Sequence, residues 1–219
     1  MCGRMGKIDK AVQALIDELG VDGFYRRILT AMQEGKLGFS LAPTEQIAFV
    51  AQPHGVETTL VGRWGLEPGW VRDPAQVKGS LFNARAESAA EKPSFRDALR
   101  RARCIVPVSG FYEWQVIPGA KRKQPYWITR SDGRPLLFAG LYALHEWGAS
   151  FTILTTAPNG LMEPIHARMP VVLDPVDVDR WLDHKVTDSR AVEDLMRPCP
   201  SEWLVAKALT RPVGEGEPE

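Results

Sequence analysis

The chain has 219 residues, of which 44% are hydrophobic, and its 27 basic side chains equal its 27 acidic ones in number. This length suits one globular domain with a sizeable core. No apolar run approaches the roughly 20 residues that a membrane-spanning helix needs, and the first residues lack the apolar segment of a secretory signal. The sequence therefore argues against a helical membrane protein and predicts a cytoplasmic one.

The cysteine content argues against a disulfide framework or a zinc centre. Cys2, Cys104 and Cys199 are odd in number and far apart, and no C-x-x-C pair or Cys/His cluster occurs. Structural zinc sites take their ligands at short, regular spacings. We expect reduced thiols, no metal and no organic cofactor.

The predicted elements begin with two helices, one from Asp9 to Leu19 with apolar residues at helical spacing and one over residues 23–33. Short β-prone runs follow, bounded by turn residues, and a short helix that Ser94 could cap interrupts them. Two late helices are predicted over residues 176–182 and 189–196. The predicted strands are 37–41, 47–51, 58–64, 104–108, 112–116, 126–129, 136–144, 151–155 and 203–208.

These strands follow one another without regular intervening helices. A βαβ array would alternate strands and helices, so the order predicts a mainly antiparallel α+β fold with a β-rich core and peripheral helices. No internal repeat or low-complexity linker divides the chain. We therefore expect one domain over residues 1–212, followed by a disordered acidic tail over 213–219, where Gly, Pro and Glu predominate.

The charges are unevenly distributed along the chain. Residues 85–134 hold 11 Lys or Arg and 5 Asp or Glu, whereas residues 135–219 hold 7 basic and 13 acidic side chains. A basic middle could offer a polyanion a surface that the zero net charge conceals. On charge alone, however, solvated faces remain the simpler interpretation.

Cys2 offers chemistry that an internal cysteine lacks. If the initiator methionine is removed, the chain begins with an α-amine and a thiol on the same residue. Such a 1,2-aminothiol can condense with an aldehyde to an imine, which the thiolate then closes to a thiazolidine ring. The same terminus could instead act as a nucleophile whose own amine is the base.

Two internal segments carry side chains suited to DNA binding. Trp64 and Trp70 are separated by Gly and Pro, which suits a rigid loop; we assign Trp64 to the core, whereas an exposed Trp70 could stack on an unpaired base. Asn83 and Arg85 lie two residues apart, so in an extended segment both point to the same face. The amide could hold a substrate oxygen and the guanidinium a phosphate, although a structural Asn beside a surface Arg would give the same pattern.

Two further segments carry groups suited to proton transfer. Glu113 is a single carboxylate within a β-prone aromatic run, where desolvation would raise its pKa towards neutrality. His166 precedes Arg168 in a loop closed by a proline, and a histidine there could stabilise a developing oxyanion. An outward-facing strand Glu fits the pattern equally well, and a surface His is the simpler alternative to a catalytic one.

Taken together, the motifs resemble those of the SOS-response-associated peptidase (SRAP) family, whose members process abasic sites. The resemblance spans residues 1–208, and the ordered set is more specific than any of its parts. The matching segments are MCGR at the start, Leu41-Ala42-Pro43, WGLEPGW, NARAES, VSGFYEW, TTAP and IHARMP.

The resemblance implies an SRAP-like fold and a monomer that crosslinks abasic sites in single-stranded DNA through Cys2 as a thiazolidine, in the cytoplasm and at the nucleoid if the protein is bacterial. It also implies a thiol peptidase that removes its own Met1, and lyase-like imine chemistry. By position, the implied catalytic residues are Cys2, Asn83, Glu113 and His166. The implied DNA-binding residues are Arg4, Pro43, Trp70, Arg85 and Arg168.

The chain departs from the family pattern at three positions. Ser40 stands where Asn is common, Val71 where a second aromatic often follows Trp70, and Ala167 where Asp is usual. The loss of an aromatic at Val71 predicts weaker base stacking, by about 1–3 kcal/mol if that contact is made.

Three other functions use the same residues. An N-terminal-nucleophile amidohydrolase, such as a class II glutamine amidotransferase, also starts Met-Cys-Gly and would release ammonia from glutamine. A Cys2–His166–Glu113 peptidase would cleave peptides in trans. A non-catalytic single-strand binder would show salt-sensitive binding with nothing covalent.

Overall fold

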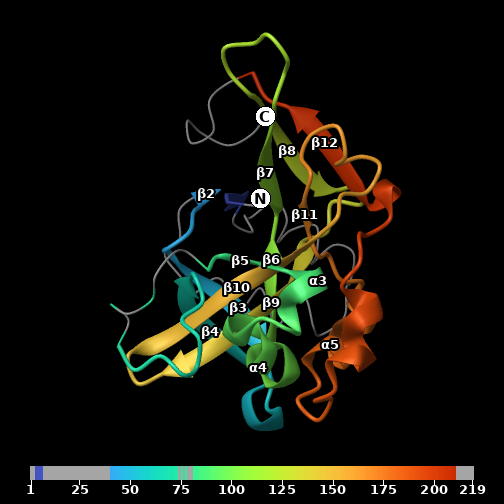
Figure 1. Ribbon diagram of the computed structural model, residues 1–219. Helices are drawn as coiled ribbons and strands as arrows, with labels where there is room; N and C mark the ends of the chain where they lie inside the picture. Colours follow the sequence, from blue (N-terminus) through green and yellow to red (C-terminus); the bar gives the residue numbers. More distant parts are fainter. Residues whose placement is uncertain (1–2, 7–39, 74, 76, 78–80, 211–219) are drawn as a thin grey trace.

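The computed structural model describes residues 3–6, 40–73, 75, 77 and 81–210 (Figure 1). Its centre is a sheet that closes on itself. Within this sheet the order is β4-β3-β6-β9, and β10 pairs with both β9 and β4, so the strands form a barrel. The barrel strands are β3 (Gln46–Ala51), β4 (Thr58–Trp64), β6 (Arg103–Val108), β9 (Leu136–His145) and β10 (Gly148–Thr156).

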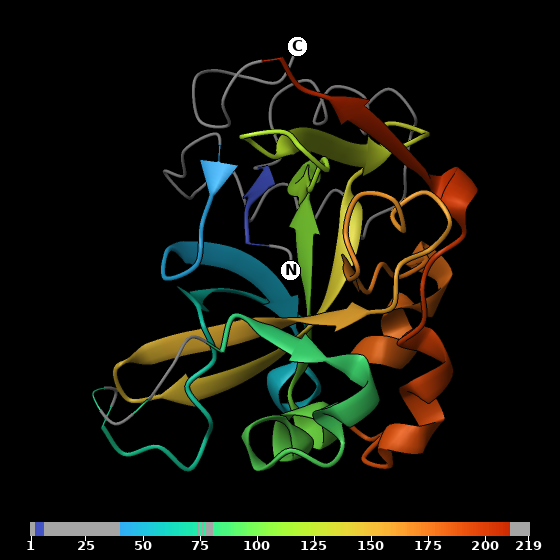
Figure 2. The same ribbon diagram turned by 45° about the horizontal axis from the view of Figure 1, so that its top comes forward.

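A second sheet lies against one end of the barrel, as Figure 2 shows. Its strand order is β12-β8-β7-β1-β2, and every pairing in it is antiparallel. Only Ser109 separates the last strand residue of β6 from the first of β7, so the chain passes from the barrel to this sheet in one step. The strands are β1 (Met5–Gly6), β2 (Ser40–Leu41), β7 (Gly110–Gln115), β8 (Gln124–Arg130) and β12 (Leu204–Ala208).

Two short strands pair with the end of β10 that continues beyond the barrel. β5 (Asn83–Arg85) runs parallel to it and β11 (Met169–Pro170) antiparallel. Among the described strands, the parallel pairs are those of β10 with β4 and β5. β5 ends and β11 begins beside Thr155 and Thr156 of β10, which brings the segment after β5 and the loop before β11 to the same end of the strand.

The helices are short and lie mainly on the side of the barrel away from the β7–β8 hairpin (Figure 1). The α-helices are α3 (Ala86–Ala89), α4 (Pro93–Arg101) and α5 (Val178–Leu182). The 3-10 turns are η1 (Pro53–Gly55), η3 (Pro175–Asp177), η4 (Ser189–Leu195) and η5 (Ser201–Trp203). None of the described helices is long and apolar enough to cross a membrane.

Two groups of buried side chains hold these layers together. One lies between the barrel and the helices and includes Leu99 of α4 and Trp181 of α5. The other lies between the barrel and the second sheet and includes Trp64, Phe111 and Phe138. Trp64 is fully buried, as expected, and its indole N–H donates to the main-chain oxygen of Phe82 at 2.9 Å. Burial of large side chains of this kind contributes about 1.5–3 kcal/mol each.

The observed fold confirms the α+β class with mainly antiparallel strands, and the predicted strands that fall in the described region are all present with shifts of a few residues at their ends. Two helix details were wrong. Pro93 occupies the first turn of α4 and Lys92 the N-cap, so Ser94 does not cap that helix, and residues 189–195 form a 3-10 helix. The two predicted N-terminal helices, residues 37–39 and the tail lie outside the described residues.

Arg103 joins the ends of two helices beneath the barrel. Its side chain is buried, and burial lowers the pKa of its guanidinium. Its three nitrogens donate only to main-chain oxygens, at 2.5–3.2 Å, at and after the ends of α4 and α5. The acceptors are Leu99, Arg100, Trp181, Asp183 and Val186.

We expect Arg103→Met to lower the free energy of unfolding by about 3 kcal/mol or more, because several buried carbonyl groups lose their donors and each unsatisfied group costs about 1–3 kcal/mol. Urea unfolding followed by circular dichroism would measure this. Arg96→Met on the exposed side of α4 is the matched control and should change stability by no more than about 0.5 kcal/mol. Equal stability of both variants would contradict this role for Arg103.

Candidate functional site

The site is built around Glu113 on β7. Its side chain is only 2% exposed, and burial raises its pKa above the ordinary value of 4.5. The charge of His166 acts in the opposite direction, because a nearby cation favours the ionised carboxylate. Because of its burial, this carboxyl group gains and loses its proton at a higher pH than an exposed carboxyl group does.

The start of the described chain pairs with β7, the strand that carries Glu113. β1 pairs with β7, Met5 opposite Phe111 and Gly6 opposite Gly110, and the N–H of Tyr112 donates to the oxygen of Arg4 at 2.9 Å. The Tyr112 pKa is raised by burial, and the charge of Arg4 lowers it in part, so this cation is close to the strand. Cys2 lies outside the described residues.

His166 lies in the loop before β11, where its Nδ1 atom is 3.0 Å from both the nitrogen and the oxygen of Arg168. When Nδ1 carries no proton, it accepts from the Arg168 N–H, and the ring proton is on Nε2. When Nδ1 is protonated, it donates to the Arg168 oxygen. The loop thus provides a partner for both protonation states, as a group that gives and takes protons requires.

The Arg168 side chain forms a bidentate ion pair with Glu87 of α3. Nη1 donates to Oε1 at 2.7 Å and Nη2 to Oε2 at 2.8 Å, and Nη2 also donates to the oxygen of Thr155 at 2.6 Å. The hydrogen bond from Arg168 lowers the Glu87 pKa. The pair ties the His166 loop to α3 and β10. A phosphate at Arg168 would have to share the guanidinium with Glu87.

Asn83 and Arg85 lie on β5, opposite Ile153 and Thr155 of β10. Ala84 between them is fully buried, whereas Asn83 is half-buried and Arg85 exposed, so the strand alternates as its sequence predicts. The amide and the guanidinium are therefore on the face of β5 that does not enter the core.

Pro43 and Trp70 lie in two loops at the ends of barrel strands. Pro43 is half-buried in the turn after β2, where the Ala42 N–H donates to Glu45 Oε2 at 2.7 Å. Trp70 is 62% exposed, whereas Val71 is 3% exposed. The Val71 side chain packs inward, so the exposed aromatic surface here belongs to Trp70, and weaker base stacking at Val71 stays a prediction.

Two residues that the sequence interpretation missed take part in this arrangement. Glu87 anchors Arg168, and Tyr112 links β7 to Arg4 through its main chain. The available signal for Glu87 was an acidic residue two positions after Arg85 in the NARAES segment. Nothing in the local pattern distinguished Tyr112 from a packing aromatic, since its role is set by the pairing of β1 with β7.

The other cysteines are unsuited to nucleophilic chemistry. Cys104 and Cys199 are buried, and burial raises the Cys104 pKa well above its ordinary value and the Cys199 pKa to about 12. Both thiols are thus protonated near neutral pH, and the thiolate is the reactive form. Within the part of the chain that the structure describes, no group of three or more His, Cys, Asp or Glu is arranged to hold a metal ion.

Comparison with protein families gives one match along almost the whole chain. The family model described as SOS response associated peptidase (SRAP) matches residues 1–216. Relatives include the Abasic site processing protein YoqW of Bacillus subtilis, 35% identical over 94% of this chain and 91% of its own length. The Abasic site processing protein YedK of Escherichia coli is 30% identical over 69% of this chain and 67% of its own length.

Solved structures resemble the fold over a similar extent. A crystal structure of a Bordetella bronchiseptica protein matches 96% of this chain and 100% of its own, with a TM-score of 0.76 and 28% identity. One from Bacteroides thetaiotaomicron matches 95% and 92%, with a TM-score of 0.75 and 26% identity. The β-rich arrangement around β7 and β10 is therefore shared with experimentally determined structures.

Proposed function

Because the chain belongs to the SOS response-associated peptidase family, we propose that it processes abasic sites in single-stranded DNA and captures them covalently through Cys2. The names of its relatives support the abasic-site role. The observation that supports the proposal is the pairing of β1 with β7, the strand that carries the buried carboxyl group of Glu113.

The proposed reaction needs Met1 to be removed, and we propose that the chain itself removes it. The free α-amine of Cys2 then adds to the C1′ aldehyde of the ring-opened deoxyribose, giving a carbinolamine. Loss of water gives an imine, and the Cys2 thiolate adds to the same carbon to close a thiazolidine. The new C–N and C–S bonds form at the cost of the aldehyde C=O bonds, and one water molecule is released overall.

In this proposal Glu113 moves the protons. It accepts one from the α-amine and returns one to the hydroxyl group that leaves the carbinolamine, and its raised pKa suits both steps. His166 protonates the sugar ring oxygen as the ring opens, and its two Nδ1 partners support either protonation state. Asn83 positions the opened sugar from β5.

The DNA strand would be held by charge and by stacking. Arg4 and Arg85 bind phosphates beside the lesion in this proposal, and Arg168 does so while retaining or exchanging its contact with Glu87. Trp70, which is largely exposed, and Pro43 pack on unpaired bases. Base–aromatic stacking is worth about 1–3 kcal/mol per base, so Trp70 would be a main contributor to affinity.

Intact-mass spectrometry tests this proposal directly. The purified chain should lack the mass of one methionine residue, and an abasic oligonucleotide should add its own mass less one water in an SDS-stable product. An oligonucleotide with a tetrahydrofuran at the lesion has no aldehyde and should give no adduct. If the chain lacking Met1 leaves the abasic oligonucleotide unmodified, the proposed function is wrong.

A further inference from the structure

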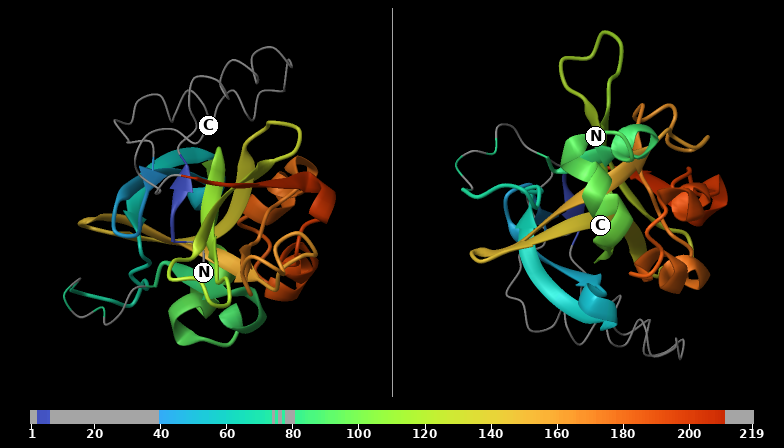
Figure 3. Two further views of the ribbon diagram at one scale, coloured as in Figure 1. Left: turned by 90° about the horizontal axis from the view of Figure 1, so that it is seen from above. Right: turned by 60° about the horizontal axis from the view of Figure 1, so that its bottom comes forward.

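The basic middle of the chain folds into two separate clusters of three cationic side chains. One is on α4 and comprises Arg96, Arg100 and Arg101. The other is at the tip of the β7–β8 hairpin, the loop over residues 116–123, and comprises Lys121, Arg122 and Lys123. All six side chains are exposed. Figures 1 and 3 show that the hairpin tip projects from the side of the molecule opposite α4.

The α4 cluster is locally compensated by acidic side chains. Arg96 pairs with Asp97 at 3.1 Å, and Arg100 donates to the main-chain oxygen of Thr187 at 3.3 Å. The Asp188 pKa is lowered mainly by its hydrogen bond with Arg190 and also by the charge of Arg100.

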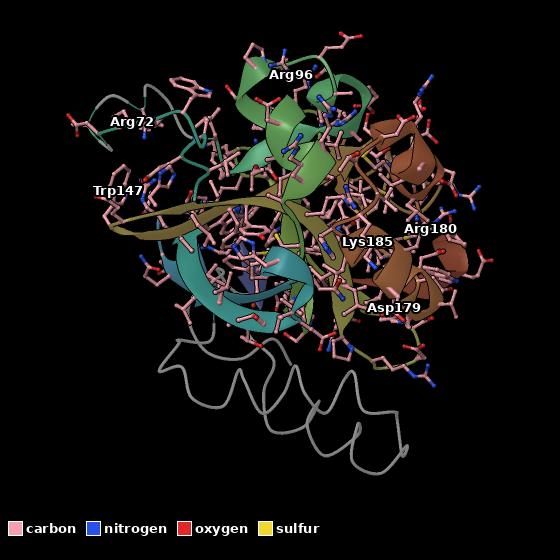
Figure 4. The ribbon with its side chains drawn as sticks, turned by 90° about the horizontal axis from the view of Figure 1, so that it is seen from below. Arg72, Arg96, Trp147, Asp179, Arg180 and Lys185 are labelled. Carbon is pink, nitrogen blue, oxygen red and sulfur yellow. The ribbon has the colours of Figure 1, made fainter. Side chains whose placement is uncertain are left out.

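These contacts place α4 beside an acidic segment of the chain. Residues 174–194 hold 7 acidic side chains and 3 Lys or Arg. Figure 4 shows Asp179, Arg180 and Lys185 of that segment to the right of the helix that carries Arg96. A polyanion approaching α4 would therefore meet acidic side chains as well as the arginines.

The hairpin tip shows no such compensation in the part of the chain that the structure describes. Among the ion pairs formed within the described residues, none involves Lys121, Arg122 or Lys123. Next to them, Val116 and Ile117 are also exposed, at 68% and 39%. Three uncompensated cations beside apolar surface are suited to a ligand that carries both phosphates and flat or aliphatic groups.

The tip is also aligned with the proposed site. Gln115 pairs with Gln124, and Glu113 with Tyr126. Lys123 therefore lies three residues further towards the hairpin tip than Glu113 does. At about 3.3 Å per strand residue, the cations begin roughly 10 Å from Glu113. With about 3.4 Å per stacked nucleotide, this corresponds to a point about three to five nucleotides from the lesion.

We propose that Lys121, Arg122 and Lys123 bind the sugar–phosphate backbone of the single strand on one side of the captured nucleotide, about three to five nucleotides away. This inference rests on the proposed function, since the strand passes Glu113 only if the lesion is held there. It predicts that affinity rises when the DNA is extended far enough on that side to reach the tip.

The test compares K121A/R122A/K123A with R96A/R100A/R101A, which removes the same charge from the other face. The probe is a labelled single strand with a tetrahydrofuran at the lesion position, carrying two or eight nucleotides on one side and then on the other. The tip variant should bind one of the long probes on the order of 10-fold more weakly than wild type, and the short probes equally well. Because each phosphate contact to a single strand contributes about 0.7 to the slope of log K against log salt, that slope should fall by about 2.

The α4 variant should match wild type on every probe. If the tip variant and the α4 variant have the same affinities and salt slopes on the long probes, the inference is wrong. Adduct formation with a short abasic oligonucleotide is measured in parallel. If wild type forms the adduct but the two variants bind with equal affinities, only the role of the tip is overturned. If wild type forms no adduct, the proposed function is overturned.

Discussion

Replacement of Cys2 by Ala will abolish the SDS-stable adduct with abasic single-stranded DNA. Whichever residue then begins the chain, its α-amine can still form an imine, but no thiolate is present at residue 2 to close the ring. Hydrolysis reverses an imine, so the product should not survive denaturation. Gel electrophoresis and intact mass would measure the loss, which should be complete.

Two further variants isolate the thiol of Cys2. Cys2→Ser should form only a reversible imine that borohydride traps, because a hydroxyl group closes the ring poorly. Cys199→Ala should retain the adduct, since burial keeps that thiol protonated and away from DNA. A normal adduct yield from Cys2→Ala would assign the chemistry to another residue.

Glu113→Gln should slow adduct formation by about 10²–10⁴-fold, the usual contribution of a positioned general acid–base group. Single-turnover rates at saturating abasic DNA would measure the effect across pH. In wild type the rate should depend on an ionisation above the ordinary carboxyl value of 4.5, and in the variant that dependence should disappear.

The same substitution should not destabilise the fold at neutral pH. Burial raises the folded-state pKa of Glu113, so the native state holds the proton more tightly than the unfolded state does. Wild-type stability must therefore fall as pH rises from the unfolded pKa through the folded one. Glu113→Gln removes this penalty, and its stability relative to wild type should be higher at pH 8 than at pH 4 in urea unfolding.

Glu67→Gln provides a matched control, because Glu67 is also a buried carboxyl group. It accepts from the Trp147 indole at 2.8 Å and pairs with Arg63 at 3.6 Å, on the loop that precedes Trp70. This variant should lose stability and keep its adduct rate at saturating DNA. If Glu113→Gln reacts at the wild-type rate, the proton-transfer role must be given to another group.

The positions of the strands could be predicted from the sequence, since alternation and turn residues are local signals. The runs at 58–64, 136–144 and 151–155 all became strands with small shifts at their ends. Closure of the barrel could not be predicted, because it depends on β10 pairing with both β9 and β4. The Ser94 cap failed for a local reason, as Pro93 already occupied the first turn of α4.

The candidate site shows the same division. The residue types of the site and their order along the chain were in the sequence, and with them the chemistry they can perform. The sequence left open whether Glu113 is buried, and it did not reveal that Arg168 is paired with Glu87 or that Val71 points inward.

The distribution of charge shows most clearly which properties the sequence determines and which depend on the tertiary structure. The sequence determined that the middle of the chain is basic. Only the tertiary structure decided that acidic side chains compensate α4, whereas no ion pair formed among the described residues involves the hairpin tip. The physical reason is that strand and helix patterns depend on neighbours along the chain. Desolvation and ion pairing depend instead on groups that folding brings together from distant parts of it.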